Sequence, residues 1–149
     1  MKQTPVVVTD VETIASSVLT VPTGGEGFID ITAEVARFLK QTGGVTGAVT
    51  LFIRHTSASL TIQENADPDV LADLITSLRR LAPADGGWRH TVEGPDDMPA
   101  HIKTMLTCSH LQIPVLDGAL ALGTWQAIYL IEHRTRTHSR EVVMQFMGS

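Results

Sequence analysis

Apolar positions recur along this chain with two different periods, which predict both helices and strands. From Asp30 to Leu39 the apolar residues have helical spacing, and Gly43-Gly44 follows, which predicts a short helix that ends at these glycines. Asp67-Pro68 begins the clearest helix, because aspartate is a good N-cap and proline suits the first helical position. The apolar face of this helix comprises Leu71, Leu74, Ile75, Leu78 and Leu81. A third helix is predicted from Pro99 to about Cys108, with Ile102, Met105, Leu106 and the Cys108 thiol facing inward.

Runs of β-branched and apolar residues predict the strands. Val6-Val7-Val8 and Ser17 to Val21 predict a strand pair, and Ala48 to Ile53 predicts a buried strand. Three further strands are predicted at Leu111 to Leu116, Thr124 to Glu132 and Glu141 to Met147. Because Thr124 to Glu132 is apolar on both faces, we expect it to be central. The pattern predicts an α+β fold, a single compact domain over residues 1–149 with one mixed or antiparallel sheet and a few helices.

Composition narrows the classes of protein to consider. The chain has 149 residues, of which 43% are hydrophobic and 18% charged, which excludes a disordered chain. Its 11 Lys and Arg against 16 Asp and Glu give a net charge of −5, which disfavours nucleic acid and anionic membranes as partners. A single cysteine excludes an internal disulfide and a cysteine-based zinc finger. The first residues show no secretory signal, and the most apolar stretch is shorter than the roughly 20 residues of a membrane span. We therefore expect a soluble cytoplasmic protein.

Three histidines are candidates for metal binding. Strand alternation places His55 at the end of the buried stripe of Val49, Leu51 and Ile53, where a neutral imidazole is a good metal ligand or general base. The alternative is a histidine at the edge of the core, bonded to a backbone carbonyl. His90 and His101 flank a polar loop, and with His55 they could form a zinc site with an open position. Their spacing matches no compact metal motif.

Two other polar stretches could carry chemistry. Glu64, Asp67 and Asp69 could bind Mg²⁺ through oxygen, although a helix N-terminus explains Asp67 and Asp69 equally well. Trp125-Gln126 could stack on and hydrogen-bond a flat heterocycle, whereas such a tryptophan is more often part of a core. The basic turn that follows Glu132 could hold phosphate through arginine, or could be a solvated hairpin end.

Four motifs together resemble the YjbQ family, also called UPF0047, which is associated with secondary thiamine-phosphate synthase activity. They are His55 to Thr61, Glu64 to Val70, Glu93 to Lys103, and Leu122 to Gln126 followed by Glu132-His133-Arg134. Two positions depart from the family pattern, Gln63 before the Glu-Asn pair and Ala127 after Trp-Gln. The resemblance implies a small α+β domain, a homotrimer, and a polar pocket containing histidine near the subunit contacts.

The resemblance also marks individual residues as candidates for the pocket, without assigning a catalyst. His55, His90 and His101 would form one metal cluster. The candidate catalytic residues are Glu64, Asn65, Asp67, Glu132 and Arg134. The candidate substrate-binding residues are Ser57, Asp97, Lys103, Trp125 and Gln126. For the family's reaction, Glu64, Asp67 and Asp97 would hold Mg²⁺ on a pyrimidine diphosphate, Lys103 and Arg134 would neutralise the departing diphosphate, and Trp125 would stack on the pyrimidine.

Three hypotheses about function follow. The first is a transferase that joins a pyrimidine diphosphate to a thiazole phosphate with Mg²⁺. The second is a metal-dependent hydrolase or lyase with Glu64 or Glu132 as its base, since three imidazoles suit Zn²⁺ better than Mg²⁺. The third is a non-enzymatic trimer that captures a small metabolite, such as a phosphorylated or heterocyclic one.

Overall fold

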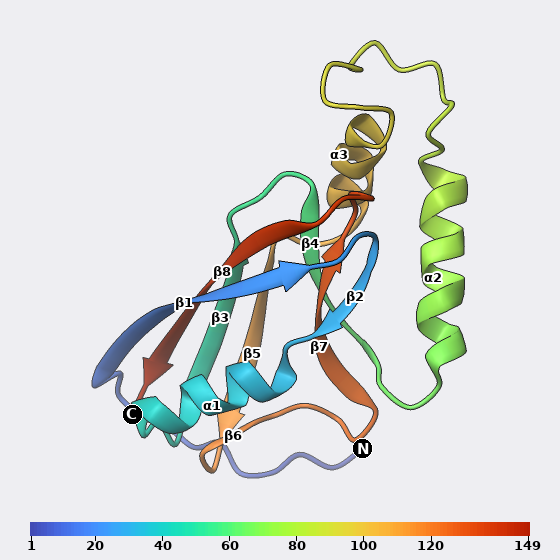
Figure 1. Cartoon of the computed structure of the whole chain (residues 1–149). Helices are drawn as coiled ribbons and strands as arrows, with labels where there is room; N and C mark the ends of the chain where they lie inside the picture. Colours follow the sequence, from blue (N-terminus) through green and yellow to red (C-terminus); the bar gives the residue numbers. More distant parts are fainter.

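The computed structural model describes residues 1–149 and contains two antiparallel sheets and three helices (Figure 1). The first sheet has five strands in the order β1 (Thr13–Thr23), β8 (His138–Gly148), β3 (Gly47–Ile53), β5 (His110–Leu116) and β6 (Ala119–Leu120). The second has three strands in the order β2 (Gly27–Asp30), β7 (Gln126–Glu132) and β4 (Ala58–Glu64). The helices are α1 (Thr32–Thr42), α2 (Pro68–Leu81) and α3 (Asp97–Leu106). None of the three has the length and apolar character that a membrane crossing requires.

The hydrophobic core is formed by side chains of both sheets and one face of α1. Alternate residues of β3 enter it, namely Val49, Leu51 and Ile53, as the strand period requires. Phe146 of β8 is fully buried in the same cluster, and α1 contributes Val35, Phe38 and Leu39. The α+β class is therefore confirmed, and so is the central position of β7, which has β2 on one side and β4 on the other.

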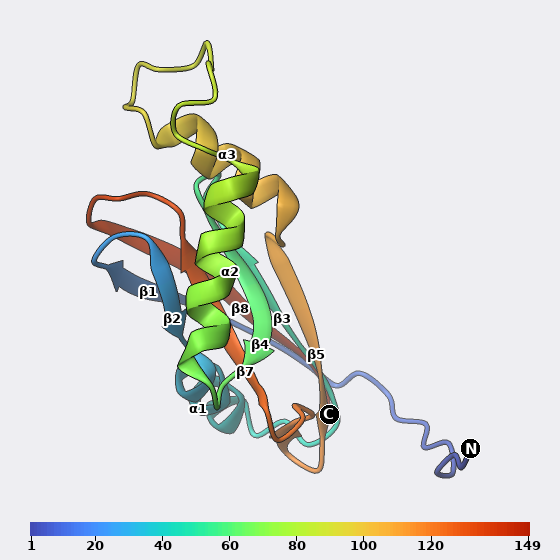
Figure 2. The ribbon, with the colours of Figure 1, turned by 90° about the vertical axis from the view of Figure 1, so that its right-hand side faces the viewer.

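Helix α2 begins as its sequence predicts. Asp67 is its N-cap and accepts a hydrogen bond from the backbone N–H of Asp69 at 2.9 Å, and Pro68 is the first helical residue. The apolar face of the helix is only partly covered, because none of its residues is fully buried and Leu81 is exposed. Figure 2 shows α2 alongside the ribbon of the sheets, with α3 across its C-terminal end.

The prediction for the inward face of α3 was wrong. Met105 and Leu106 are exposed, and the helix instead buries Asp97, Pro99, Ala100 and Lys103. Cys108 lies beyond the end of the helix and is exposed. The physical reason is that ion pairs hold the buried face of α3, and a search for apolar periodicity does not detect such a face.

Two predictions about strands were also wrong. Val6, Val7 and Val8 are exposed and lie outside any strand, in the segment that runs away from the body of the molecule in Figure 2. The partner of β1 is β8, which it meets along its whole length from Thr13–Gly148 to Thr23–His138. The strands form two sheets rather than one, because β4 follows β3 directly but pairs with β7.

Candidate functional site

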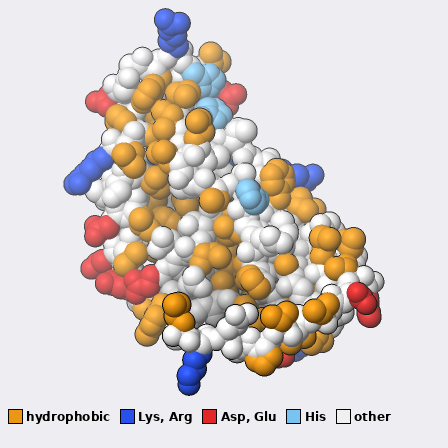
Figure 3. Space-filling view, turned by 180° about the vertical axis from the view of Figure 1, so that it is seen from behind, with side chains coloured by type: hydrophobic (Ala, Val, Ile, Leu, Met, Phe, Trp, Pro, Cys, Tyr) orange, Lys and Arg blue, Asp and Glu red, His pale blue; other side chains and the backbone are white.

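Helix α3 presents polar side chains on two of its faces. Asp97 and His101 are four residues apart and lie on one face, and Pro99 and Lys103 lie on another. Asp97 and Lys103 are both buried, although charged side chains are rarely buried without a partner. The polar loop before the helix brings His90 to the same end of the molecule. Figure 3 shows two histidine side chains next to each other on the surface at this end.

His90, Asp97 and His101 form a compact group of metal-ligand atoms. One atom from each residue lies within 4.8 Å of the others. Asp97 Oδ2 is 2.6 Å from His90 Nε2 and 3.3 Å from His101 Nε2. His101 Nδ1 donates a hydrogen bond to the Thr56 carbonyl at 2.9 Å, which fixes the ring and leaves Nε2 to face the carboxylate. The 2.6 Å contact between Asp97 and His90 is a hydrogen bond, and a metal ion could replace its proton and bind all three residues.

The second oxygen of Asp97 is held by Arg134. The buried Arg134 guanidinium binds Asp97 Oδ1, lies 3.1 Å from Asp96 Oδ2, and donates to the Glu93 carbonyl at 2.7 Å. Burial alone would raise the pKa of Asp97, but the hydrogen bond with His90 and the charge of Arg134 outweigh burial and hold this pKa below its usual value. Burial would also raise the pKa of Asp96, yet hydrogen bonds from Thr135 and Arg134 lower it to about 2. Two carboxylates therefore share one guanidinium, which leaves a net negative charge that favours a cation beside Asp97.

His55 does not belong to this group. Its Nε2 accepts a hydrogen bond from the Glu141 backbone N–H at 2.9 Å, and its Nδ1 faces the Arg140 guanidinium at 3.4 Å. Burial and the charge of Arg140 lower the pKa of His55, so the ring is neutral near pH 7. The structure thus brings together two of the three predicted histidines, and the third member is Asp97, which the sequence analysis places in substrate binding.

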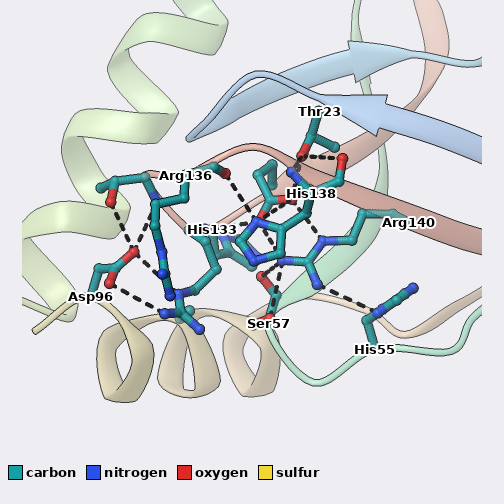
Figure 4. Close-up of polar contacts among 12 residues, drawn as sticks. Thr23, His55, Ser57, Asp96, His133, Arg136, His138 and Arg140 are labelled. Carbon is teal, nitrogen blue, oxygen red and sulfur yellow. Dashed lines mark hydrogen bonds and ion pairs between the residues drawn. The ribbon is translucent and has the colours of Figure 1, made fainter. Parts of the chain in front are cut away.

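Glu132 forms the centre of a buried network with Arg140. Its carboxylate accepts hydrogen bonds from Arg140 Nε and Nη2 at 2.7 and 2.6 Å and from the Thr23 hydroxyl at 2.8 Å. The Arg134 backbone N–H donates to the same carboxylate, and Arg140 also donates to Ser57 Oγ at 3.1 Å (Figure 4). Burial would raise the pKa of Glu132, but these partners lower it. Both carboxylate oxygens are occupied, which suits a structural ion pair better than a base.

Five other predicted residues lie at the opposite end of the second sheet. Glu64 and Gln126 face each other at the end of the β4–β7 pair, and the Asn65 N–H donates to the Trp125 carbonyl. Asp67 caps α2, and Trp125 is exposed. Thr56, which holds His101, precedes the start of β4, and a strand of this length spans ~20 Å. The predicted site residues are therefore divided between two ends of the molecule.

Comparison with known proteins agrees with this architecture. The family model described as "UPF0047 protein YjbQ-like" matches residues 17–149. The chain belongs to the YjbQ-like family. A UPF0047 protein of Synechocystis sp. is 48% identical over 132 residues, which are 88% of this chain and 90% of that protein. The UPF0047 protein YjbQ of Escherichia coli O157:H7 is 40% identical, over 87% of this chain and 95% of that protein.

Solved structures show the same YjbQ-like fold. A conserved YjbQ-family protein of Clostridium acetobutylicum superposes with a TM-score of 0.79 at 38% identity, over 89% of this chain and 98% of that one. A hypothetical protein of Aeropyrum pernix K1 superposes with a TM-score of 0.84 at 29% identity, over 91% and 99% of the two chains. These relatives establish the family and the fold, whereas any activity has to be inferred from the geometry of the site.

Sequence analysis missed two polar residues near α3. Glu26 binds Lys103 and Arg79, although the sequence suggests only that it belongs to a glycine-rich turn. His133 is buried beside β7, where strand alternation gives it the same face as Tyr129 and Ile131. Two features of the sequence could have indicated them. Glu26 is a charged residue within a glycine cluster, and His133 is a histidine on an apolar strand face.

Proposed function

We propose that this YjbQ-like protein is a metal-dependent enzyme that catalyses a hydrolytic or lyase reaction on a small molecule. The observation that carries the proposal is the meeting of His90, Asp97 and His101 within 4.8 Å. Two imidazoles and one carboxylate suit Zn²⁺ and other first-row divalent metals, and Zn²⁺ with three protein ligands keeps a position open for water or substrate. A metal bound there would supply Lewis acidity at that position.

The surrounding residues support such a role. The Thr56 carbonyl orients His101, and Arg134 fixes the carboxylate of Asp97, which is the outer support that metal ligands usually have. His90 is partly exposed and lines a hollow of about 450 Å³ together with Asp85, Trp88 and Thr91. A small substrate bound in this hollow would reach the ligand group directly from solvent.

The transferase of the first hypothesis fits this geometry less well. A departing diphosphate at the metal cluster needs a free cation there, whereas Arg134 is paired with Asp96 and Asp97, and Lys103 lies on the other face of α3 beside Glu26. Glu64 and Asp67, the expected Mg²⁺ ligands, lie at the other end of β4 from the histidines. The proposal therefore places the metal-dependent reaction first.

Metal analysis of the purified, untagged protein tests the proposal. We expect close to one transition-metal ion per chain in the wild type, loss of that metal in His101→Ala, and full retention in His110→Ala, which removes an exposed histidine of β5. A wild type without transition metal after growth with added zinc would refute the metal site, and so would a His101→Ala variant that keeps its metal.

We also propose that the protein forms a homotrimer, as the family resemblance implies. The face of the five-stranded sheet that points away from the core supports association, because it carries apolar side chains in register. Val18 and Phe52 flank Val143 in one row across three strands, and Ile14 lies opposite Met147 in another. A molar mass of three chains by light scattering is expected, and a monomer at micromolar concentration would contradict this assignment.

A further inference from the structure

A second pocket lies on the other polar face of α3, the face of Pro99 and Lys103. Its volume is about 340 Å³, and Glu26, Arg79, Asp96 and His133 also line it. None of the metal-cluster residues His90, Asp97 and His101 lines it. The proposed metal function therefore does not account for this pocket.

Two cations in this pocket share one carboxylate. Glu26 Oε1 accepts a hydrogen bond from the buried Lys103 ammonium, and Glu26 Oε2 lies 2.6 Å from Arg79 Nε. Burial would raise the pKa of Glu26, but the contacts with Lys103 and Arg79 outweigh burial and lower it, so Glu26 is a carboxylate near pH 7. The group of Arg79, Glu26 and Lys103 therefore carries a net positive charge. Glu26 is the one hydrogen-bond partner of the Lys103 ammonium, which leaves donors of that ammonium free.

His133, which also lines this pocket, has an unpartnered and buried polar atom. Only 1% of the residue is exposed, its Nε2 lies 2.8 Å from the Ser59 hydroxyl oxygen, and its Nδ1 has no hydrogen-bond partner. Burial and the nearby charge of Lys103 lower the pKa of His133 to about 4, so the ring is neutral near pH 7. When the Ser59 hydroxyl donates to Nε2, the single ring proton is on Nδ1, which can then donate to a ligand. Because buried polar atoms almost always have partners, a missing partner at Nδ1 is informative.

We propose that this pocket binds a small oxyanion, a carboxylate or phosphate group, through Lys103 Nζ, His133 Nδ1 and the Arg79 guanidinium. One negative charge compensates the unbalanced cation of the Arg79–Glu26–Lys103 group, and an oxyanion oxygen accepts the free protons of the ammonium and the imidazole. Asp96 also lines the pocket, and its carboxylate oxygens are bound by Arg134 and Thr135.

The rest of such a ligand has room in an adjoining hollow. This hollow measures about 510 Å³, follows the chain from Gly24 to Ile29, and shares Glu26, Arg79 and Thr135 with the Lys103 pocket. Helix α3 thus separates two sites of opposite preference. A cation is favoured beside Asp97 and His101, and an anion is favoured beside Lys103.

NMR of the protein with ¹⁵N-labelled histidine tests the proposal, with sodium acetate and inorganic phosphate as separate probes at constant ionic strength. We expect at least one probe to shift the His133 Nδ1 resonance saturably, and the stronger of the two identifies the carboxylate or the phosphate as the group recognised. Arg79→Gln should weaken that binding about tenfold, which is the effect of losing one charged hydrogen bond. The matched control is Arg80→Gln, which removes the neighbouring exposed arginine and should bind as the wild type does.

Two further variants separate this pocket from the metal cluster. Lys103→Met should abolish binding. Because Lys103 is buried, this variant could also disturb folding, whereas replacing the exposed Arg79 tests binding without that effect. His101→Ala should bind the probe as tightly as the wild type. Absence of a saturable shift with both probes would overturn the proposal. Equal weakening in Arg79→Gln and Arg80→Gln would overturn it, and so would loss of binding in His101→Ala.

Discussion

The buried histidine that follows β7, His133, should make the stability of this protein fall as the solution becomes mildly acidic. Burial lowers the pKa of His133 from 6.5 to about 4 in the folded protein. Between these two values the unfolded chain binds a proton that the folded chain does not, so the free energy of unfolding decreases as pH falls through this window. Each unit of difference is worth about 1.4 kcal/mol, so lowering the pH from 7.5 to 5 should cost about 2 kcal/mol through His133.

Urea unfolding at pH 7.5 and pH 5, followed by circular dichroism, measures this cost. The informative variant is His133→Gln, because a glutamine amide can replace Nε2 beside Ser59 without titrating. We expect the wild type to lose about 2 kcal/mol more than this variant between the two pH values. His110→Gln, which removes an exposed histidine, should lose as much as the wild type. Equal losses in wild type and His133→Gln would refute the assignment of a neutral, buried His133.

Two further predictions concern the framework around the site. Glu132→Gln should lower the free energy of unfolding by about 3–5 kcal/mol, because Arg140 would remain buried without its full counter-charge. The control, Glu141→Gln, should lower it by less than about 1 kcal/mol, because the pair of Glu141 with Arg54 is exposed. Similar losses in the two variants, measured by urea unfolding, would contradict the structural role of Glu132. Gly25→Ala should cost about 1–3 kcal/mol in thermal or urea unfolding, because Gly25 has a φ of +126° and an added Cβ would lie 2.9 Å from the Thr135 carbonyl oxygen. Gly24→Ala is the control, since its Cβ would meet nothing within 4 Å, and a cost equal to that of Gly25→Ala would count against the strain.

Local sequence patterns predicted the helices and strands whose structure depends on residues nearby in the sequence. The N-cap and first residue of α2 follow from Asp67 and Pro68 alone. The buried stripe of β3 follows from strand alternation, and the strand predicted over Glu141 to Met147 lies within β8. Val6–Val8 has the same kind of composition but no partner strand, because β1 pairs with β8 instead. β-strand propensity therefore indicated which segments could form strands and not which of them would be paired.

The histidine cluster also shows that local patterns do not determine which distant residues meet. His101 and Asp97 lie four residues apart on α3, a spacing that the sequence displays directly. His55 and His90 looked equivalent as partners, yet the Glu141 backbone holds His55 elsewhere. Periodicity describes one element at a time, and it gives no measure of distance between residues in different elements.

The sequence by itself determined the family, the α+β class, the extent of α2 and most of the core strands, but not β4, whose Ala58 and Leu60 also enter the core. Only the tertiary structure decided that Asp97 joins His90 and His101, and that Lys103 meets Glu26 across 77 residues of chain. The physical reason lies in the range of the forces. Capping and side-chain alternation act over a few residues, whereas a buried charge needs a partner that any distant segment can supply. Which segment supplies it depends on how the sheets and helices pack, and that packing is a property of the whole chain.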